Sequence, residues 1–328
     1  MSTDASDRSS SARLAKASEQ LNLLAHELHI ALAEASDVGT PLDMLSWVSS
    51  RLTGQALDLA EITLAVAEDV VSSCGDPRAE RSAAALGRVS RIIEPVFEAA
   101  SQVAAHLVIC AEKAVRQRRA LAAADLSALD TRITGLLAEN QNLITGAGVA
   151  TAPHALADET LWMQWWVHGP RGPIQLFPQL DSRAAHFYDY PSAVWFSESA
   201  RDLAPHLAPP HYDDGGTDTW MVTATVPVVV RGRLLGLACA ELTLERIGTL
   251  VAPALRAMSA PAALVCPEGL VVASTHPGLH PGSTVPDSRW HQQGHEAAAF
   301  VEPSPGLTVA RSPALAWRIV ADWTLAVR

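Results

Sequence analysis

Clustered basic residues are scarce in this sequence of 328 residues. It contains 24 lysines and arginines against 35 aspartates and glutamates, which gives a formal net charge of −11. The basic run that stands out is short and comprises Arg116, Arg118 and Arg119. Nucleic acids are bound mainly through lysine and arginine contacts to phosphate groups. A nucleic-acid partner is therefore not expected, and an acidic protein is better suited to cationic ligands.

Cysteine is also rare, and the few cysteines are not paired along the chain. The four cysteines are far apart and each lies in an apolar stretch: Cys74, Cys110, Cys239 and Cys266. A zinc site that uses cysteines typically contains a C-x-x-C pair, and no such pair occurs. We therefore expect buried thiols of the kind found in a reducing compartment, and neither a metal nor a cofactor.

The sequence lacks a secretory signal and a long uninterrupted apolar run. The N-terminal residues MSTDASDRSSSARLAK contain no apolar segment followed by a cleavage site. No stretch reaches the roughly 18 consecutive apolar residues that a membrane span needs. Together with the isolated cysteines, these absences predict a cytoplasmic protein with no membrane contact.

The signatures of common enzymes are missing as well. No G-x-S-x-G, no phosphate-binding P-loop and no G-x-G-x-x-G after a strand can be found. His291 and His295 are four residues apart, but the intervening Gln-Gln-Gly does not make a zinc-protease motif. The sequence favours a binding protein over an enzyme.

The two halves of the chain differ in composition. Residues 1–140 are rich in Ala, Leu, Glu and Arg, whereas residues 141–328 hold eight of the nine tryptophans and all three tyrosines. A shift of this kind marks a domain boundary. We place a helical bundle module at 1–125 and a ligand-binding domain at 126–328.

Helical periodicity dominates the first half. Leu21, Leu24, Leu28 and Leu32 recur at steps of three and four residues, and a broad apolar face covers residues 93–111. Turn signals precede Pro41 and Pro77, and a break near 123–125 precedes a last helix that ends near residue 140. We predict three or four antiparallel helices. Their alanine-rich stripes fit a bundle core or the seam of a homodimer equally well, and we expect a homodimer through these helices.

Short strands alternate with turns in the second half. Residues 221–230 and 234–244 flank Arg231-Gly232-Arg233, and residues 262–265 and 270–275 flank Pro267-Glu268-Gly269, so each pair predicts a β-hairpin. The segment Trp162–Trp166 is interpreted as helical, with Trp162, Trp165 and Trp166 on one face. Strands with interspersed helices indicate an α+β fold.

Four motifs follow one another in the second half. They are FYDYPSAVWF (187–196), PHYD (210–213), TATVPV (223–228) and GRLLGLACAELTL (232–244). In this order and spacing they resemble the double-Cache family of small-molecule sensors. The resemblance implies a PAS-like fold, in which a long lead-in helix, here about 126–140, precedes a curved antiparallel sheet that holds the ligand. The main lobe then extends to about residue 255, and residues 256–328 form a short second lobe.

The resemblance also implies a ligand site. Amino-acid-sensing members hold the ligand's ammonium group with tyrosines and aspartates, and its carboxylate with arginine and tryptophan. Transferred to this sequence, with Trp165 as a pocket wall, the expected ligand-binding residues are Trp165, Tyr188, Asp189, Trp195, His211, Tyr212, Asp213 and Glu241.

The sequence departs from the family pattern at the carboxylate end of the site. The positions of the two family arginines are occupied by Pro191 and Ala193, so the usual bidentate donor is missing. Aromatic faces and carboxylates together suit an organic cation, and we therefore expect an amine as the ligand. An amino-acid sensor in which Arg183 or Arg201 replaces the lost arginines is the first alternative.

Two further alternatives belong to other classes of protein. One is a hydrolase that uses Asp213, Glu241 and a nearby histidine, and the other is a dimeric scaffold with a degenerate pocket. The same residues also have structural interpretations, because tryptophans are common in cores and aspartates are common in turns.

Overall fold

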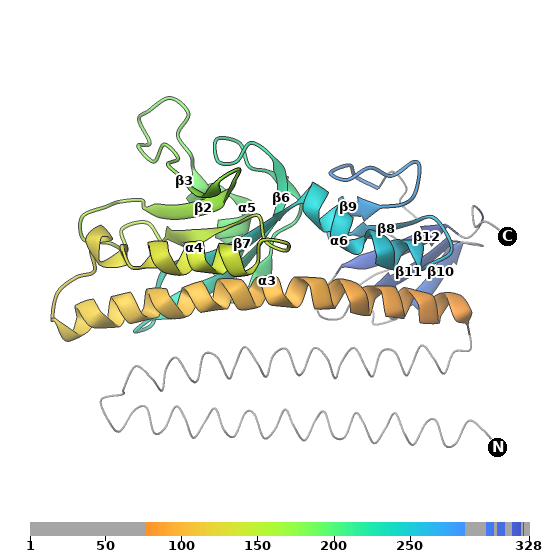
Figure 1. Cartoon of the computed structure of the whole chain (residues 1–328), viewed down its shortest axis with the longest axis horizontal. Coiled ribbons are helices and arrows are strands. Elements are labelled where there is room, and N and C mark those ends of the chain that lie inside the picture. The colour runs from red at the N-terminus through yellow and green to blue at the C-terminus, as the bar shows by residue number, and fades with distance from the viewer. Residues whose placement is uncertain (1–75, 286–299, 305–306, 312–316, 323, 325–328) are drawn as a thin grey trace, which may run out of the picture. The chain divides into compact units, whose positions relative to one another are not determined.

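The computed structural model describes residues 76–285, 300–304, 307–311, 317–322 and 324 (Figure 1). The helices expected before residue 76 lie outside this part, and the homodimer stays a prediction. Contacts divide the chain into two compact units, one of residues 92–250 and one that combines residues 1–91 with 251–328.

Two helices and a connecting turn precede the sheet of the 92–250 unit. Helix α3 covers Pro77–Arg116, the 3-10 turn η1 covers Ala123–Leu126 and helix α4 covers Leu129–Glu139. The side chain of Asp76 accepts the backbone N–H of Arg78 at 2.9 Å and so caps α3. The prediction of a helix that breaks near 123–125 and resumes to about 140 is confirmed.

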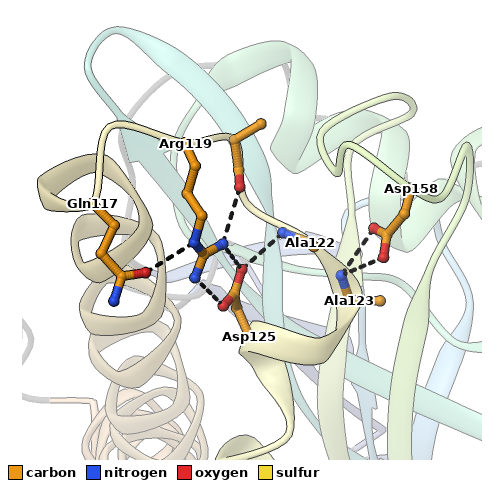
Figure 2. Close-up of polar contacts among 7 residues, drawn as sticks. Gln117, Arg119, Ala122, Ala123, Asp125 and Asp158 are labelled. Atoms are coloured by element: carbon orange, nitrogen blue, oxygen red, sulfur yellow. Dashed lines mark hydrogen bonds and ion pairs between the residues drawn. The ribbon is translucent and has the colours of Figure 1, made fainter.

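Polar contacts fix the chain where it leaves α3 (Figure 2). Arg119 forms an ion pair with Asp125, with a nitrogen–oxygen distance of 2.5 Å. Asp125 also accepts the N–H of Ala122 at 3.0 Å, and Asp158, from the loop after the first strand, accepts the N–H of Ala123 at 3.0 Å. These contacts tie η1 to the sheet domain.

A seven-stranded antiparallel sheet forms the body of this unit. The order is β3-β2-β1-β7-β6-β4, with β5 paired to β6. The strands are β1 Gly146–Thr151, β2 Met163–Gly169, β3 Gly172–Leu176, β4 His206–Leu207, β5 His211–Tyr212, β6 Trp220–Val230 and β7 Arg233–Thr243. The predicted hairpin around Arg231-Gly232-Arg233 is confirmed as β6 and β7. The α+β fold of PAS type is confirmed with it.

Helix α4 packs on one face of this sheet. It contacts β1, β2 and β3, and its apolar residues Ile133, Leu136 and Leu137 are fully buried. Asp130 at the start of the helix accepts hydrogen bonds from Gln164 Nε2 and from Trp166 Nε1, the latter at 3.2 Å.

An aromatic cluster covers the opposite face. It includes Trp165 from β2, Tyr190 from the 3-10 turn η2 (Tyr190–Ser192), and Trp195 and Phe196 from helix α5 (Val194–Asp202). The ring centroids of neighbouring members lie 5.2–6.2 Å apart. Tilted and edge-on ring pairs at such distances stabilise a core beyond the area they bury.

The prediction that Trp162–Trp166 is helical is wrong. The segment enters β2, which pairs with β1 on one side and β3 on the other. Strand alternation therefore places Trp165 and Trp166 on opposite faces of the sheet. Aromatic residues are common in strands, and the hydrogen bonds that β2 forms with both neighbouring strands favour the extended conformation over a helix.

Tyr190 links the aromatic cluster to β1 through a buried hydroxyl. The hydroxyl donates to the Thr151 carbonyl at 2.6 Å and accepts the Trp162 N–H at 3.3 Å. Tyr190→Phe leaves both backbone groups without this partner and is expected to lower the free energy of unfolding by about 1–2 kcal/mol. Urea denaturation measures the loss. The matched control is Tyr212→Phe, since Tyr212 is half exposed, and equal stability of the two variants would contradict the assignment.

The described C-terminal residues form a second antiparallel sheet. Its order is β10-β11-β12-β8-β9. Its strands, preceded by helix α6 (Leu244–Arg256), are β8 Ala262–Val265, β9 Val271–Ser274, β10 Phe300–Ser304, β11 Leu307–Arg311 and β12 Arg318–Asp322. The predicted hairpin around Pro267-Glu268-Gly269 is confirmed as β8 and β9. The Arg318 guanidinium donates to the Cys266 and Pro267 carbonyls at 3.3 and 3.0 Å and so ties β12 to this turn.

Candidate functional site

A cavity of about 90 Å³ lies on the sheet face that carries the aromatic cluster. Strands β2, β3, β5, β6 and β7, helix α5 and two loops contribute to its wall. The lining residues are Met163, Trp165, Leu176, Phe177, Pro178, Tyr188, Trp195, His211, Asp213, Gly215, Gly216, Met221, Thr223 and Glu241. All of them belong to the 92–250 unit.

Two acids, Asp213 and Glu241, line the cavity, and Asp213 is the more exposed to solvent. It follows β5 and is 8% exposed. Its Oδ1 accepts the Tyr188 hydroxyl at 2.5 Å, and its Oδ2 accepts the N–H and the hydroxyl of Thr217 at 2.7 and 3.1 Å. Asp213 therefore has two roles: its carboxylate forms hydrogen bonds within the Asp213-Asp214-Gly215-Gly216 turn, and it also lines the cavity. Burial, followed by the neighbouring Asp213 charge, raises the pKa of the Tyr188 hydroxyl, which therefore remains a donor.

Glu241 lies deeper, on the central strand β7. Its side chain is 2% exposed, and strand alternation directs it to the cavity face. Burial, with the nearby Asp213 charge adding to it, raises the pKa of this carboxyl to about 8, while a hydrogen bond from Trp165 acts in the opposite direction. A carboxyl group with this pKa carries a proton in much of the empty protein at neutral pH.

His211 contributes a hydrogen-bond acceptor. Its Nδ1 lies 2.9 Å from the Pro209 carbonyl, which only accepts, so the proton sits on Nδ1. Burial lowers the pKa of the imidazole and keeps the ring neutral. Its Nε2 is buried and has no hydrogen-bond partner among the residues that the structure describes. A ligand N–H would satisfy this atom.

Aromatic and apolar side chains make up the rest of the wall. Trp165 and Trp195 are nearly fully buried, with ring centroids 5.7 Å apart. No lysine or arginine is among the described lining residues. Arg183 and Arg201, the two suggested substitutes for the missing family arginines, are exposed and pair instead with Asp181 and Asp202 at 3.1 and 2.7 Å.

The cavity brings together six of the eight expected site residues: Trp165, Tyr188, Trp195, His211, Asp213 and Glu241. Asp189 and Tyr212 do not line it, and both are exposed. Tyr212 follows His211 along β5, so strand alternation turns its ring to the other side, where it meets Trp220 edge-on at 6.1 Å.

Sequence reasoning missed the apolar lining. Met163 precedes Trp165 by two residues, and Met221 and Thr223 stand in the same relation to each other on β6. Period-two alternation through the motif residues points to all three. Leu176, Phe177 and Pro178 come from the end of β3 and the loop after it, and no signal in the sequence indicates their place.

Residues 136–249 match the model of one protein family, described as "Methyl-accepting chemotaxis protein-like, first PDC sensor domain". No curated protein matches the chain. Among solved structures, the ligand-binding domain of the amino-acid chemoreceptor PctC of Pseudomonas aeruginosa PAO1, in complex with GABA, is 15% identical, with a TM-score of 0.49 over 79% of this chain and 100% of that one. The sensory domain of the Campylobacter jejuni chemoreceptor Tlp3, with isoleucine bound, is 11% identical, with a TM-score of 0.48 over 81% and 94%. The extracellular domain of soHK1S-Z6, named as a histidine kinase, is 16% identical, with a TM-score of 0.42 over 72% and 95%.

Residues 136–249 are a Cache-type sensor domain. The family match covers the four motifs and every lining residue of the cavity. The double-Cache resemblance is therefore confirmed at the level of this domain. The description of the matched family names a sensor domain.

The predictions of a cytoplasmic protein and of no membrane contact are corrected by these findings. The matched family is described as a sensor domain of methyl-accepting chemotaxis protein-like proteins. Among the described helices, α3 is long and apolar enough to cross a membrane by length and composition. The sequence argument failed because it asked for an uninterrupted apolar run, whereas an apolar stretch with occasional charges also reaches a high mean hydropathy. Isolated buried thiols say little about compartment.

Proposed function

We propose that the Cache-type domain is a sensor for a small organic amine, which it binds as the ammonium cation. One observation supports this above all others. Two acids, Asp213 and Glu241, line one small buried cavity, and no described lysine or arginine lines it with them. A buried carboxylate without a partner cation is costly, and a ligand cation would supply the partner.

The remaining polar groups suit an N–H donor. His211 Nε2 and the two carboxyl groups are all acceptors, so a primary ammonium group with three N–H bonds could be shared among them. The faces of Trp165 and Trp195 add a favourable environment for a cation. The ammonium group would bind between the acids, and the apolar body of the ligand would lie against Met163, Leu176 and Met221.

The size of the cavity limits the ligand. The cavity volume of about 90 Å³ is small beside the roughly 300–1,000 Å³ of pockets that hold drug-sized ligands. This volume suits a ligand of a few non-hydrogen atoms. An α-amino acid would also fit by size, but its carboxylate would enter an acidic cavity that offers it no described arginine or lysine.

A ligand panel of matched compounds tests this function. n-Propylamine, alanine and propionate differ in which charges they carry while keeping a three-carbon body. We expect n-propylamine to raise the melting temperature of the full chain saturably, since a ligand at 100 times its Kd stabilises by about 2.7 kcal/mol. Stabilisation by alanine with no response to the amine would instead support the amino-acid alternative. Hydrolysis of the corresponding amide, N-propylacetamide, to acetate and n-propylamine, followed by NMR, would support the hydrolase alternative.

The rest of the chain would carry the signal. We propose that residues 126–328 are the ligand-binding domain, with a lead-in helix that corresponds to α4, and that residues 1–125 are a helical module that pairs with a second copy. Sedimentation of the full chain at several concentrations measures the pairing.

A further inference from the structure

Two glycines lie beneath the deepest side chains of the cavity. Strand β1 alternates Gly146-Ala147-Gly148, and its register places Gly146 opposite Glu241 on β7 and Gly148 opposite Trp165 on β2. Paired residues in an antiparallel sheet point to the same face. Glu241 and Trp165 line the cavity and the two glycines do not, so each side chain lies between a glycine and the open space.

A side chain at either glycine would occupy space that is already filled. A Cβ atom on Gly146 would lie 2.1 Å from Glu241 Oε1 and 2.8 Å from its Cδ. A Cβ atom on Gly148 would lie 2.6 Å from the Trp165 ring and 2.3 Å from the Gln164 carbonyl oxygen. Non-bonded carbon atoms are in contact at about 3.5–4.0 Å. The Glu241 carboxyl group therefore occupies the space that a side chain at position 146 would fill.

We propose that Gly146, with Gly148 beside it, determines how bulky a cation head group the cavity admits. The inference rests on the proposed amine function. With alanine at 146, the Glu241 carboxyl group must move away from position 146 by about 1 Å or more, and the space open to it is the cavity that Glu241 lines. The head-group end of the cavity then narrows while both acids remain present. Gly146 is a positioning residue, since it acts through Glu241 and does not touch the ligand.

The test compares three amines that differ in head group. n-Propylamine, N-methylpropylamine and N,N-dimethylpropylamine share one body, carry one positive charge each and keep at least one N–H donor. Calorimetry on the full chain gives the Kd of each for the wild type, Gly146→Ala and Gly135→Ala. Gly135 is the matched control, because it belongs to α4 and a Cβ atom there would meet no atom within 4 Å.

We expect Gly146→Ala to weaken the binding of N,N-dimethylpropylamine at least tenfold more than the binding of n-propylamine. Gly135→Ala is expected to leave this ratio within twofold of the wild-type ratio. An unchanged ratio in Gly146→Ala, while the amines still bind, would overturn the inference and leave the proposed function standing. Failure of the wild type to bind any of the three amines would overturn the proposed function and the inference on selectivity together.

If Gly146→Ala folds too poorly for binding measurements, a double-mutant cycle of unfolding free energies tests the contact between position 146 and Glu241. Unfolding is measured for Gly146→Ala, Glu241→Ala and the double variant. If the added methyl group clashes with the Glu241 carboxyl group, Gly146→Ala is destabilising in the wild type and nearly neutral in the Glu241→Ala background. An equal loss of stability in both backgrounds would mean that the clash is with the strand itself, and would overturn the role of Gly146. Gly148→Ala is unsuited to the test, because its Cβ atom would also meet backbone.

Discussion

Asp213→Asn is expected to weaken binding of n-propylamine by at least about thirtyfold. Removing one charge from a buried, hydrogen-bonded ion pair costs about 2–5 kcal/mol, and 2 kcal/mol corresponds to about thirtyfold in Kd. Asparagine keeps the shape of the side chain but removes the negative charge. Its amide group also cannot accept the Tyr188 hydroxyl and both donors of Thr217 at once, as the carboxylate does.

Calorimetry measures this loss, and the melting temperature of the unliganded variant shows whether the fold is retained. Tyr212→Ala is the matched control, because Tyr212 is adjacent to His211 on β5 but does not line the cavity. We expect its Kd to stay within twofold of the wild-type value. A folded Asp213→Asn variant with wild-type affinity would contradict the placement of the ammonium group beside Asp213.

The sequence motifs predicted residues of the cavity because they contain polar and charged side chains as well as apolar ones that pack in the core. Trp195, Asp213 and Glu241 stand in separate motifs, and the fold brings all three to one cavity. An acidic residue in the apolar run of β7 signals a special environment from the sequence alone, since buried carboxyl groups are rare. Which way Glu241 points followed only when the register with Gly146 and Thr223 was known.

The position of a residue within a strand decides on which face of the sheet its side chain lies, and the sequence alone did not give these positions. Tyr212 and His211 are adjacent in one motif, and a shift of one residue decides which of them faces the ligand. The interpretation of Trp162–Trp166 failed for a related reason, because spacing alone fits a helix while pairing with β1 and β3 makes a strand. The role of Gly146 depends on an atom of a residue 95 positions away, and no local pattern contains that information.

Binding of an amine is expected to strengthen as the pH rises from 6 to 8. The Glu241 carboxyl group has a pKa of about 8 in the empty protein, so below that pH an arriving cation must displace a proton from it. The apparent affinity then rises by up to tenfold per pH unit and levels off above pH 8, until the amine itself loses its proton near pH 10. Calorimetry at pH 6 in buffers of different ionisation enthalpy is expected to count about one proton released per ligand. Glu241→Gln is expected to bind with no such pH dependence.

The same carboxyl group makes the empty domain less stable at high pH. Glutamate has a pKa of 4.5 when unperturbed and about 8 here, so between these values the folded state holds a proton that the unfolded state has lost. The stabilisation is complete below pH 4.5 and disappears as the pH rises through 8, with a slope of up to about 1.4 kcal/mol per pH unit in the free energy of unfolding. Urea denaturation between pH 5 and 8 measures this slope, and Glu241→Gln should remove it. A wild-type slope equal to that of the variant would mean that Glu241 is already ionised in the empty cavity. Amine binding would then release no proton, and the acid pair would attract the cation with its full charge at every pH in this range.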